Sequence, residues 1–433
     1  MTATTLPRDP APLATRLDRA APFCVLGIPP AMLHAFAVAE ALIAIILLLF
    51  LARSGLLKDW SWLRRPWVRI ALVWWGWAIL CSLPFIREGG IGEGGGRSLV
   101  QALVTGRYIL FIAALEHVVL ADPAIRRWLW AVLAACAAWI GLSAVLQAAI
   151  GRNLGGYPRW GDGELTGPFQ KPRAGPPLAR LLPVAIIPPI FRLLASGREW
   201  WRPALAALLA GAAIASVVLI GQRMPVLLTV LALAVAALFL PRLRMPVAAA
   251  LALGAALLAA SAVVAPPTFY RLVTKFTTQM ANWPESNYGQ IASRAVAIAQ
   301  DHPLTGRGFE GFRSGCMQER YWRGWNHATN PADTGGGALG CNLHPHNMYL
   351  QAVTDAGLPG LALYTAMVLA WGLALARGLW RHPAPLRVAL FATYVAAFWP
   401  LSSSMNAFSI EFGGLTFLLV GFALAEAKAA ESK

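Results

Sequence analysis

The chain of 433 residues contains little charge, because Asp, Glu, Lys and Arg together make up only 13% of it. A soluble protein of ordinary composition carries about a quarter of such residues, so the sequence excludes a water-soluble globular protein. Apolar residues reach 58% instead, and several apolar runs approach or exceed the ~18 residues that cross a bilayer. We therefore predict an all-α, polytopic membrane helical bundle of about 12 spans.

Acidic residues are especially scarce: there are 20 Asp and Glu against 36 Lys and Arg, a formal net charge of +16. In a soluble chain this excess would indicate nucleic-acid binding. Here most of it falls in short loops between apolar runs, which the positive-inside rule assigns to the cytoplasmic side, so we expect membrane lipids and no nucleic acid as partners. These basic loops cover residues 53–69, 126–127, 192–202, 242–244 and 377–387.

This topology divides the chain into three stretches of one integrated domain. We expect N-terminal membrane helices over 1–265, a large loop outside the cytoplasm with an amphipathic helix over 266–345, and C-terminal membrane helices over 346–433. The first apolar stretch, Pro22 to Ala52, is interrupted by two prolines at 29 and 30. It can form one long span or a broken hairpin of two, which gives about 11 or 12 spans in total.

The five cysteines contain no Cys-x-x-Cys pair, which argues against a zinc site. Cys24, Cys81 and Cys136 lie in apolar runs, where we expect inert packing residues. Cys316 and Cys341 lie in the large loop, on the side of the membrane where disulfides persist. We predict a disulfide between them, closing a loop of about 25 residues at a gain of ~3 kcal/mol. The alternative is two unpaired thiols.

Two further patterns look like cofactor sites and are not interpreted as such. Asp162 and Glu164 resemble an acidic pair that holds a divalent metal in some sugar transferases, but hard cations need more oxygen ligands, so a solvated loop pair is the better interpretation. Gly306, Gly308 and Gly311 match a dinucleotide fingerprint without the required strand and helix, which predicts a sharp loop turn. We expect no metal and no other cofactor.

The most informative stretch of the sequence is 341–360, which contains two histidines, His344 and His346, directly before a short helical pattern. Asn347 is a good N-cap for that helix, and Gly357 suits its left-handed C-cap, before a proline starts a long apolar helix. His346 therefore lies at a helix N-terminus at the mouth of a membrane segment, where an anion binds well.

Two arginines outside the basic loops are candidate anion-binding residues. Arg223 lies in a turn too short for an ordinary hydrophilic loop, and arginines at such a membrane boundary are costly and often functional. Arg294 lies at the edge of an apolar helix face formed by Ile291, Ala295 and Ile298. The alternatives are an arginine that reaches to the headgroups in the first case and a capping or interfacial arginine in the second.

A Gly- and Pro-rich segment over 166–180 adds further cations before a membrane span. Lys171, Arg173 and Arg180 are directed toward the same face of the membrane. This arrangement suits the binding of an anionic lipid headgroup.

Three motifs in this order resemble the O-antigen ligase / O-antigen polymerase superfamily of bacterial inner-membrane glycosyltransferases. The first is the turn that contains Arg223 before a mid-chain span. The second is a loop helix with Arg294 followed by Asp-His-Pro-Leu-x-Gly-x-Gly-Phe at 301–309. The third is Pro-His-Asn-x-Tyr-Leu-Gln at 345–351 with Gly-Leu-Pro-Gly-Leu at 357–361.

The resemblance covers roughly residues 166 to 417 and implies a helical body similar to C-type glycosyltransferases. It implies a metal-independent enzyme of the bacterial inner membrane whose active site faces the periplasm. The donor would be a glycan linked to undecaprenyl pyrophosphate. The acceptor would be a lipid A–core sugar for a ligase, or another lipid-linked glycan for a polymerase. A lipid-linked sugar transporter is a third possibility, although the two related halves typical of transporters are not evident.

The resemblance also implies roles for individual residues. Arg223 and Arg294 match the arginines that grip the donor pyrophosphate, and His346 matches the essential histidine. His346 can act as the general base for the acceptor hydroxyl or as a pyrophosphate ligand, and the sequence leaves both open. His344 and Asn347 are further candidate substrate contacts.

Overall fold

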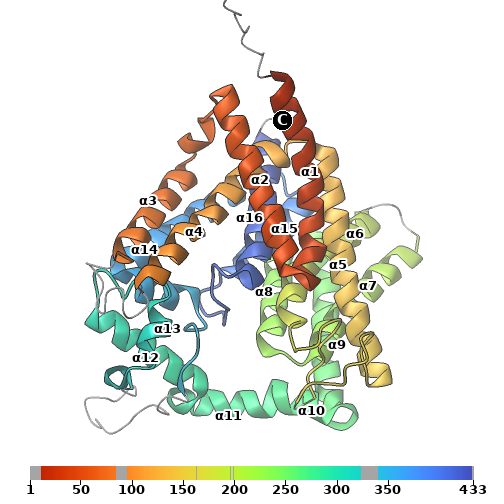
Figure 1. The fold of residues 1–433 in the computed structure, drawn as a ribbon. Coiled ribbons are helices and arrows are strands. Elements are labelled where there is room, and N and C mark those ends of the chain that lie inside the picture. Colours follow the sequence, from red (N-terminus) through yellow and green to blue (C-terminus); the bar gives the residue numbers. More distant parts are fainter. Residues whose placement is uncertain are drawn as a thin grey trace, which may run out of the picture.

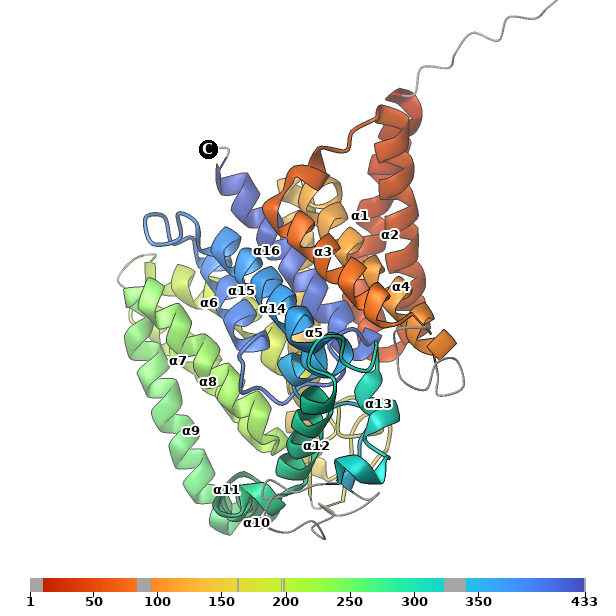
Figure 2. The same cartoon turned by 90° about the vertical axis from the view of Figure 1, so that its left-hand side faces the viewer.

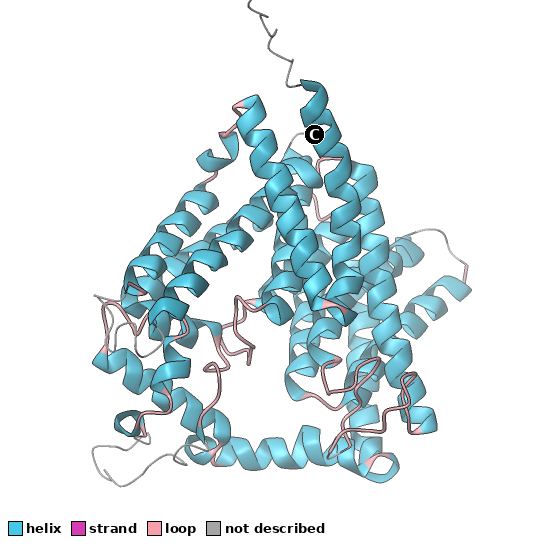
Figure 3. Ribbon diagram, in the orientation of Figure 1, coloured by secondary structure: helices cyan, strands magenta, loops and turns pink. Residues whose placement is uncertain are grey.

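The computed structural model describes residues 11–83, 95–161, 163–195, 197, 199–322 and 340–431. Over these ranges the chain is helical and contains no strand, only two isolated β-bridges near residues 152–164, so the all-α prediction is confirmed (Figure 3). Within the same ranges eight helices are long and apolar enough to cross a membrane, and four other apolar helices are shorter. The chain is a multi-pass membrane protein, and the count of about 12 spans stays a prediction.

The helices have the following bounds. The longer ones are α1 (Ala11–His34), α2 (Phe36–Leu57), α3 (Pro66–Cys81), α4 (Gly95–Ala114), α5 (Pro123–Ile150), α6 (Gly175–Ala195), α7 (Trp201–Ile220), α8 (Arg223–Phe239), α9 (Arg244–Val264), α12 (Asn287–Asp301), α14 (Met348–Ala376), α15 (Pro385–Ala397) and α16 (Leu415–Glu431). Shorter elements are α10 (Pro266–Phe269), α11 (Lys275–Ala281), α13 (Gly311–Gly315), the 3₁₀ turns Ser61–Arg64, Pro241–Leu243, Trp283–Glu285 and Glu319–Tyr321, and the π turns η2 (Leu115–Val119), η4 (Tyr270–Thr274) and η8 (Ile410–Gly414).

The first apolar stretch forms a hairpin of two helices, the second of the two alternatives. The chain leaves helical geometry at Ala35 (φ −148°), not at the prolines at 29 and 30, which stay inside α1. Helices α1 and α2 pack along each other (Figure 2). The approach is close at Gly27, where a Cβ atom would lie 3.1 Å from the Leu42 side chain.

The apolar interior joins helices from both ends of the chain. One buried cluster draws on α1–α7 and α14–α16, and a second draws on α6–α9 and α15. Helix α14 packs on α3, and α16 packs on α4. The predicted N-terminal and C-terminal stretches therefore share one core, because neither set of helices buries its apolar faces alone.

The large loop begins with a crossbar, formed by α10, η4 and α11, that lies across one end of the bundle and leads into α12 (Figure 1). Ser286 caps α12 by accepting a hydrogen bond from the amide of Gly289. Ser293 and Ala297 are buried as well, although they lie outside the apolar face formed by Ile291, Ala295 and Ile298. A small apolar cluster that contains Phe312 covers α12, so more of its circumference is buried than one apolar stripe predicts.

Candidate functional site

The N-terminus of α14 is built by the capping residue that the sequence predicts. The Asn347 side chain accepts hydrogen bonds from the amides of Tyr349 (2.9 Å) and Leu350 (3.1 Å), so the N-cap is confirmed. The helix is interrupted at Gly357, which has a φ of +68°. A Cβ atom there would lie 2.3 Å from the backbone of Leu304, so only glycine fits this kink.

The glycine motif at 306–311 is the turn that packs against this kink. Gly306 has a φ of +60°, and a Cβ atom on it would lie 2.6 Å from the carbonyl oxygen of Thr354. The next amide, of Arg307, donates to the same oxygen at 2.8 Å. The amide of Gly311 donates to the carboxylate of Asp355 at 3.0 Å. The predicted sharp turn is confirmed, and it ties the large loop to α14.

His346 lies where three parts of the chain meet. Its backbone has a φ of +53°, and its carbonyl oxygen accepts a hydrogen bond from the amide of Ser404 at 2.8 Å. The Nε2 atom lies 2.8 Å from the side-chain nitrogen of Asn342. The ring centroid is 5.5 Å from that of Tyr288 on α12 and 4.4 Å from that of His344. The histidine is thus positioned by tertiary contacts as well as by its own helix.

Both histidine rings are partly buried, and this burial disfavours the charged imidazolium. Burial lowers the pKa of His346 below its ordinary value. Burial, together with the neighbouring His346, lowers the pKa of His344 to about 4. Both rings are therefore neutral at pH 7, so His346 can accept a proton there.

Arg294 lies in the interior of the large loop with no exposed surface. Its guanidinium donates to the carbonyl oxygen of Cys316 at 3.0 Å and lies 2.9 Å from the sulfur of Cys341. It also faces the Trp322 ring at 5.4 Å. Burial lowers the pKa of Arg294 to about 10, so the side chain is charged at pH 7. In this conformation a substrate phosphate does not reach the guanidinium.

The same region contains the two cysteines of the large loop. Cys316 and Cys341 are joined by a disulfide, with their Cα atoms 5.7 Å apart. Most of the segment that they bracket, residues 323–339, lies outside the described residues. The disulfide holds the chain a few residues before His346, directly against the guanidinium of Arg294.

Arg223 is the first residue of α8 and lies beneath the crossbar. Its guanidinium donates to the side-chain oxygen of Gln279 and lies 5.7 Å from the Phe276 ring, both on α11. The preceding residue, Gln222, donates to the carbonyl oxygen of Pro172 at 2.8 Å. The short turn thus joins the crossbar to the Gly- and Pro-rich segment before α6.

Glu164 is buried and paired, which corrects the prediction of a solvated acidic loop residue. Its carboxylate lies 2.9 Å from the guanidinium of Arg271 on η4 and also accepts a hydrogen bond from Gln222. The crossbar folds over this loop and excludes water from the pair. Asp162, the other residue of the acidic pair, lies outside the described residues. Among the residues the structure describes, no three His, Cys, Asp or Glu side chains form a group that could hold a metal ion.

The three basic side chains that the sequence placed on one face, Lys171, Arg173 and Arg180, have different surroundings in the structure. Arg173 pairs with Glu411 at 2.9 Å, and the buried guanidinium of Arg180 lies 4.0 Å above the Phe412 ring. Both partners belong to η8. Lys171 is exposed. Arg173 and Arg180 therefore converge on the turn before α16, while Arg223 faces the crossbar.

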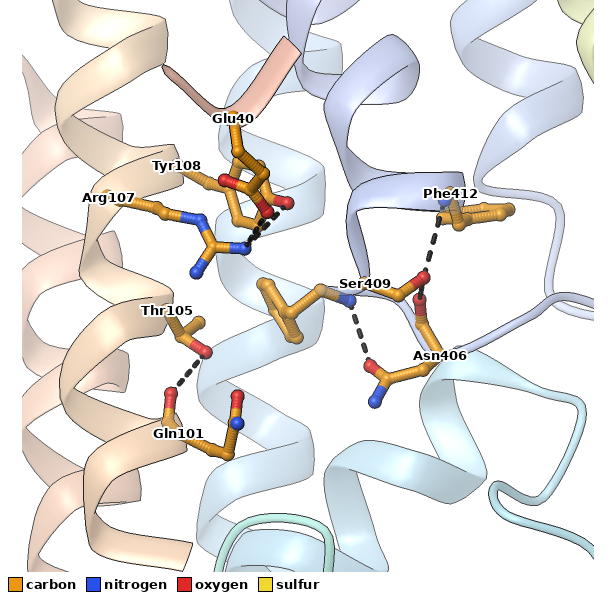
Figure 4. A network of polar contacts seen from close by, with 9 residues as sticks. Glu40, Gln101, Thr105, Arg107, Tyr108, Asn406, Ser409 and Phe412 are labelled. Carbon is orange, nitrogen blue, oxygen red and sulfur yellow. Dashed lines mark hydrogen bonds and ion pairs between the residues drawn. The ribbon is translucent and has the colours of Figure 1, made fainter. Parts of the chain in front are cut away.

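One polar pair inside the membrane body escaped the sequence analysis. The guanidinium of Arg107 on α4 lies 2.8 Å from the carboxylate of Glu40 on α2 and 3.1 Å from the hydroxyl of Tyr108. Figure 4 shows this pair near the hydrogen-bonded turn of Asn406 and Ser409. Charged residues within membrane helices are rare and often functional. The position of Glu40 and Arg107 as single charges inside apolar runs could therefore have identified this pair from the sequence.

Comparison with known proteins assigns part of this region to a family. Residues 205–365 match a family model described as O-antigen ligase. The matched range contains Arg223, Arg294 and His346 together with both cysteines of the disulfide. No curated protein matches the chain.

Proposed function

We propose that this chain, which matches a family model described as O-antigen ligase over residues 205–365, is an O-antigen ligase-like glycosyltransferase. It moves a glycan from undecaprenyl pyrophosphate to a sugar of lipid A–core. The reaction takes place at the periplasmic face of the bacterial inner membrane. Members of the family are glycosyltransferase-like enzymes, and the donor, the acceptor and the location are the proposed parts.

The observation that carries the proposal is that Arg223, Arg294 and His346 each belong to or contact a helix of the large loop. Arg223 contacts α11, Arg294 lies within α12, and the ring of His346 contacts Tyr288 of α12. Residues more than 120 positions apart in the family range are thus organised by two consecutive helices. A cation and a neutral imidazole beside one membrane end suit a lipid-linked anionic donor.

Arg223 is the proposed cation for the donor. When the sugar C1–oxygen bond breaks, negative charge develops on the pyrophosphate that leaves with the lipid. A fixed guanidinium stabilises this charge, and loss of one such group typically costs ~3–4 kcal/mol of barrier. Arg223 now donates to the neutral amide of Gln279, and a phosphate oxygen is a stronger, charge-assisted acceptor that can replace it.

His346 is the proposed general base. It takes the proton of the acceptor hydroxyl while that oxygen forms a bond to the donor C1 and the pyrophosphate departs. The lowered pKa supports this role over pyrophosphate binding, because a neutral ring accepts a proton and offers no charge to a phosphate. Of the two roles that the sequence leaves open, we therefore propose the first.

Arg294 is proposed to position the site. Its guanidinium holds the carbonyl of Cys316 and lies against Cys341, which precedes His346 by five residues. It thereby fixes the loop that enters the catalytic segment. Lys171, Arg173 and Arg180 are the proposed contacts for an anionic lipid headgroup, with His344 and Asn347 next to the reacting groups.

Deletion of the gene tests the proposed function. A ligase leaves full-length glycan on its lipid carrier with none attached to lipid A–core. Single repeats attached to the core would show a polymerase instead. Lipid-linked repeats trapped in the cytoplasm would show a flippase and overturn the assignment to a transferase.

A further inference from the structure

A small cavity lies where the start of α3 meets the ends of α14 and α16. Figure 2 shows the end of α16, marked C, at the end of the bundle remote from α10 and α11. The cavity measures about 40 Å³, which is room for about three water-sized groups. Alanine side chains of α14 and α16 and Leu424 form its apolar wall. A phosphate group fits this space, whereas a sugar ring does not.

The buried carboxylate of the cavity, Glu116, already has its partners. It lies on η2 and is only 4% exposed. One of its oxygens lies 2.8 Å from the guanidinium of Arg65, and the other accepts a hydrogen bond from the indole nitrogen of Trp67 at 2.9 Å. Glu116 and Arg65 therefore balance each other's charge and fix the start of α3 against the end of α4.

Two further cations line the cavity. Lys428 on α16 is half-buried, and Arg377 is exposed directly after α14. Within the described ranges, neither side chain has a hydrogen bond or an ion pair with another residue. Glu431, exposed at the end of α16, is the remaining charged residue of the lining. With the Glu116–Arg65 pair balanced, two cations face one solvated carboxylate, and the cavity is net positive.

The helix ends around the cavity also favour an anion. Arg65 is the N-cap of α3 and Pro66 is its first residue, so the positive end of this helix dipole points at the cavity. The ends of α14 and α16 contribute the opposite dipole, but each carries one of the two cations, Arg377 and Lys428. An anion in the cavity would thus meet positive charge from all three helices.

We propose that this cavity binds the phosphate of an anionic phospholipid, held by Arg377 and Lys428. Basic pockets between membrane helices recognise such headgroups, and the basic loops that contain Arg65 and Arg377 are expected beside the anionic cytoplasmic leaflet. The apolar wall of α14 and α16 offers contact to the rest of the lipid, which selects a lipid over inorganic phosphate. The lipid would join α3, α14 and α16 at the end of α14 remote from His346.

The test uses the purified full-length protein, freed of lipid in detergent and titrated with phosphatidylglycerol. Native mass spectrometry measures the bound lipid. We expect one saturable phosphatidylglycerol site and weaker binding of zwitterionic phosphatidylethanolamine. Lys428→Gln and Arg377→Gln should each weaken the binding of phosphatidylglycerol about fivefold, because each removes one cation from the headgroup. Lys428→Arg, which keeps the charge, should bind as the unchanged protein does.

Arg381→Gln is the matched control, because Arg381 is exposed in the loop after α14 and does not line the cavity. It should leave the affinity unchanged. Glu431→Gln should tighten binding, since it removes the one solvated carboxylate of the lining. Equal losses in Arg377→Gln and Arg381→Gln would show a general attraction between basic loops and lipid and would overturn the proposal.

Two other outcomes would also contradict the proposal. Unchanged affinity in both Lys428→Gln and Arg377→Gln would remove the headgroup from this cavity. Complete displacement of phosphatidylglycerol by an equal concentration of inorganic phosphate would identify a site for the free ion and not for a lipid. Because binding is the quantity measured, these results are independent of whether the chain transfers glycan.

Discussion

Arg223 is the side chain whose replacement tests the donor clamp most directly. We expect Arg223→Ala to lower kcat by about 10²–10³-fold, because the variant lacks the fixed positive charge that stabilises the leaving pyrophosphate. Arg223→Lys should restore little, since an ammonium lacks the planar, bidentate geometry of a guanidinium. Transfer assays on purified variants measure this. Arg244→Ala, which replaces an exposed arginine at the start of α9, is the control. Near-normal turnover of Arg223→Ala would remove Arg223 from the site.

The two histidines allow a comparison between neighbouring rings. His346→Ala should be inactive, whereas His344→Ala should retain substantial activity, because His346, and not His344, occupies the Pro-His-Asn position of the segment that resembles the family. Equal loss in both variants would show that the rings act as a unit and that the assignment of the base is wrong. Steady-state transfer rates at matched membrane insertion decide between these outcomes.

The pH dependence follows from the neutral state of His346. A base must be unprotonated, so kcat/KM falls as the pH drops through its pKa. Burial lowers that pKa, so we expect the activity to persist below pH 6.5, the ordinary histidine value, and to fall only at more acidic pH. A pH profile with its midpoint above 6.5 would contradict the neutral buried ring and favour a charged, phosphate-binding histidine.

At the scale of elements, α12 and the disulfide loop depend on Arg294. We expect Arg294→Ala to lower kcat and to make the disulfide easier to reduce, because the carbonyl of Cys316 loses its charged donor. The loosened loop should expose His346 more to water, which raises its pKa and shifts the acidic limb of the pH profile to higher pH. Arg313→Ala, an exposed arginine on α13, is the control. Lost activity with an unchanged pH profile would instead favour a direct role in donor binding.

The disulfide between Cys316 and Cys341 in the large loop can be tested directly. Peptides from protein purified from native membranes should show Cys316 linked to Cys341 by mass spectrometry without reduction. The double Ser variant should lower the stability of the loop by about 3 kcal/mol in the chain-entropy view. Free, alkylatable thiols at both positions would contradict the bridge, and with it the placement of the loop outside the cytoplasm.

For the whole molecule we expect catalysis without a bound metal ion. The positive charge comes from arginine, and Glu164, a residue of the acidic motif, is engaged by Arg271. Addition of a chelator should therefore leave the transfer rate unchanged. Strong inhibition that magnesium or manganese reverses would direct attention back to Asp162 and Glu164.

Features that depend on neighbouring residues were accessible from the sequence. The apolar runs predicted the helices, since a chain in a bilayer must satisfy its backbone hydrogen bonds within each segment. Asn347 and Gly357 predicted a helix start and a kink because capping and positive φ involve only a few adjacent residues. The family motifs likewise lie within short stretches, and the family match over 205–365 confirmed the resemblance.

Features that depend on distant residues were decided only by the tertiary structure. Helix periodicity placed Arg294 at an edge, but it is completely buried and lies against Cys316, Cys341 and Trp322. Glu164 was expected in solvent, but the crossbar brings Arg271 to it from more than a hundred residues away.

The sequence by itself determined a helical membrane protein with a cation and a histidine beside one large loop, because hydrophobic length, caps and turns are local properties. The tertiary structure alone decided which charges are paired, which are enclosed and which line one cavity. These properties depend on the packing of helices that are separate in the sequence, and the free energy of a charge depends on all the groups that surround it.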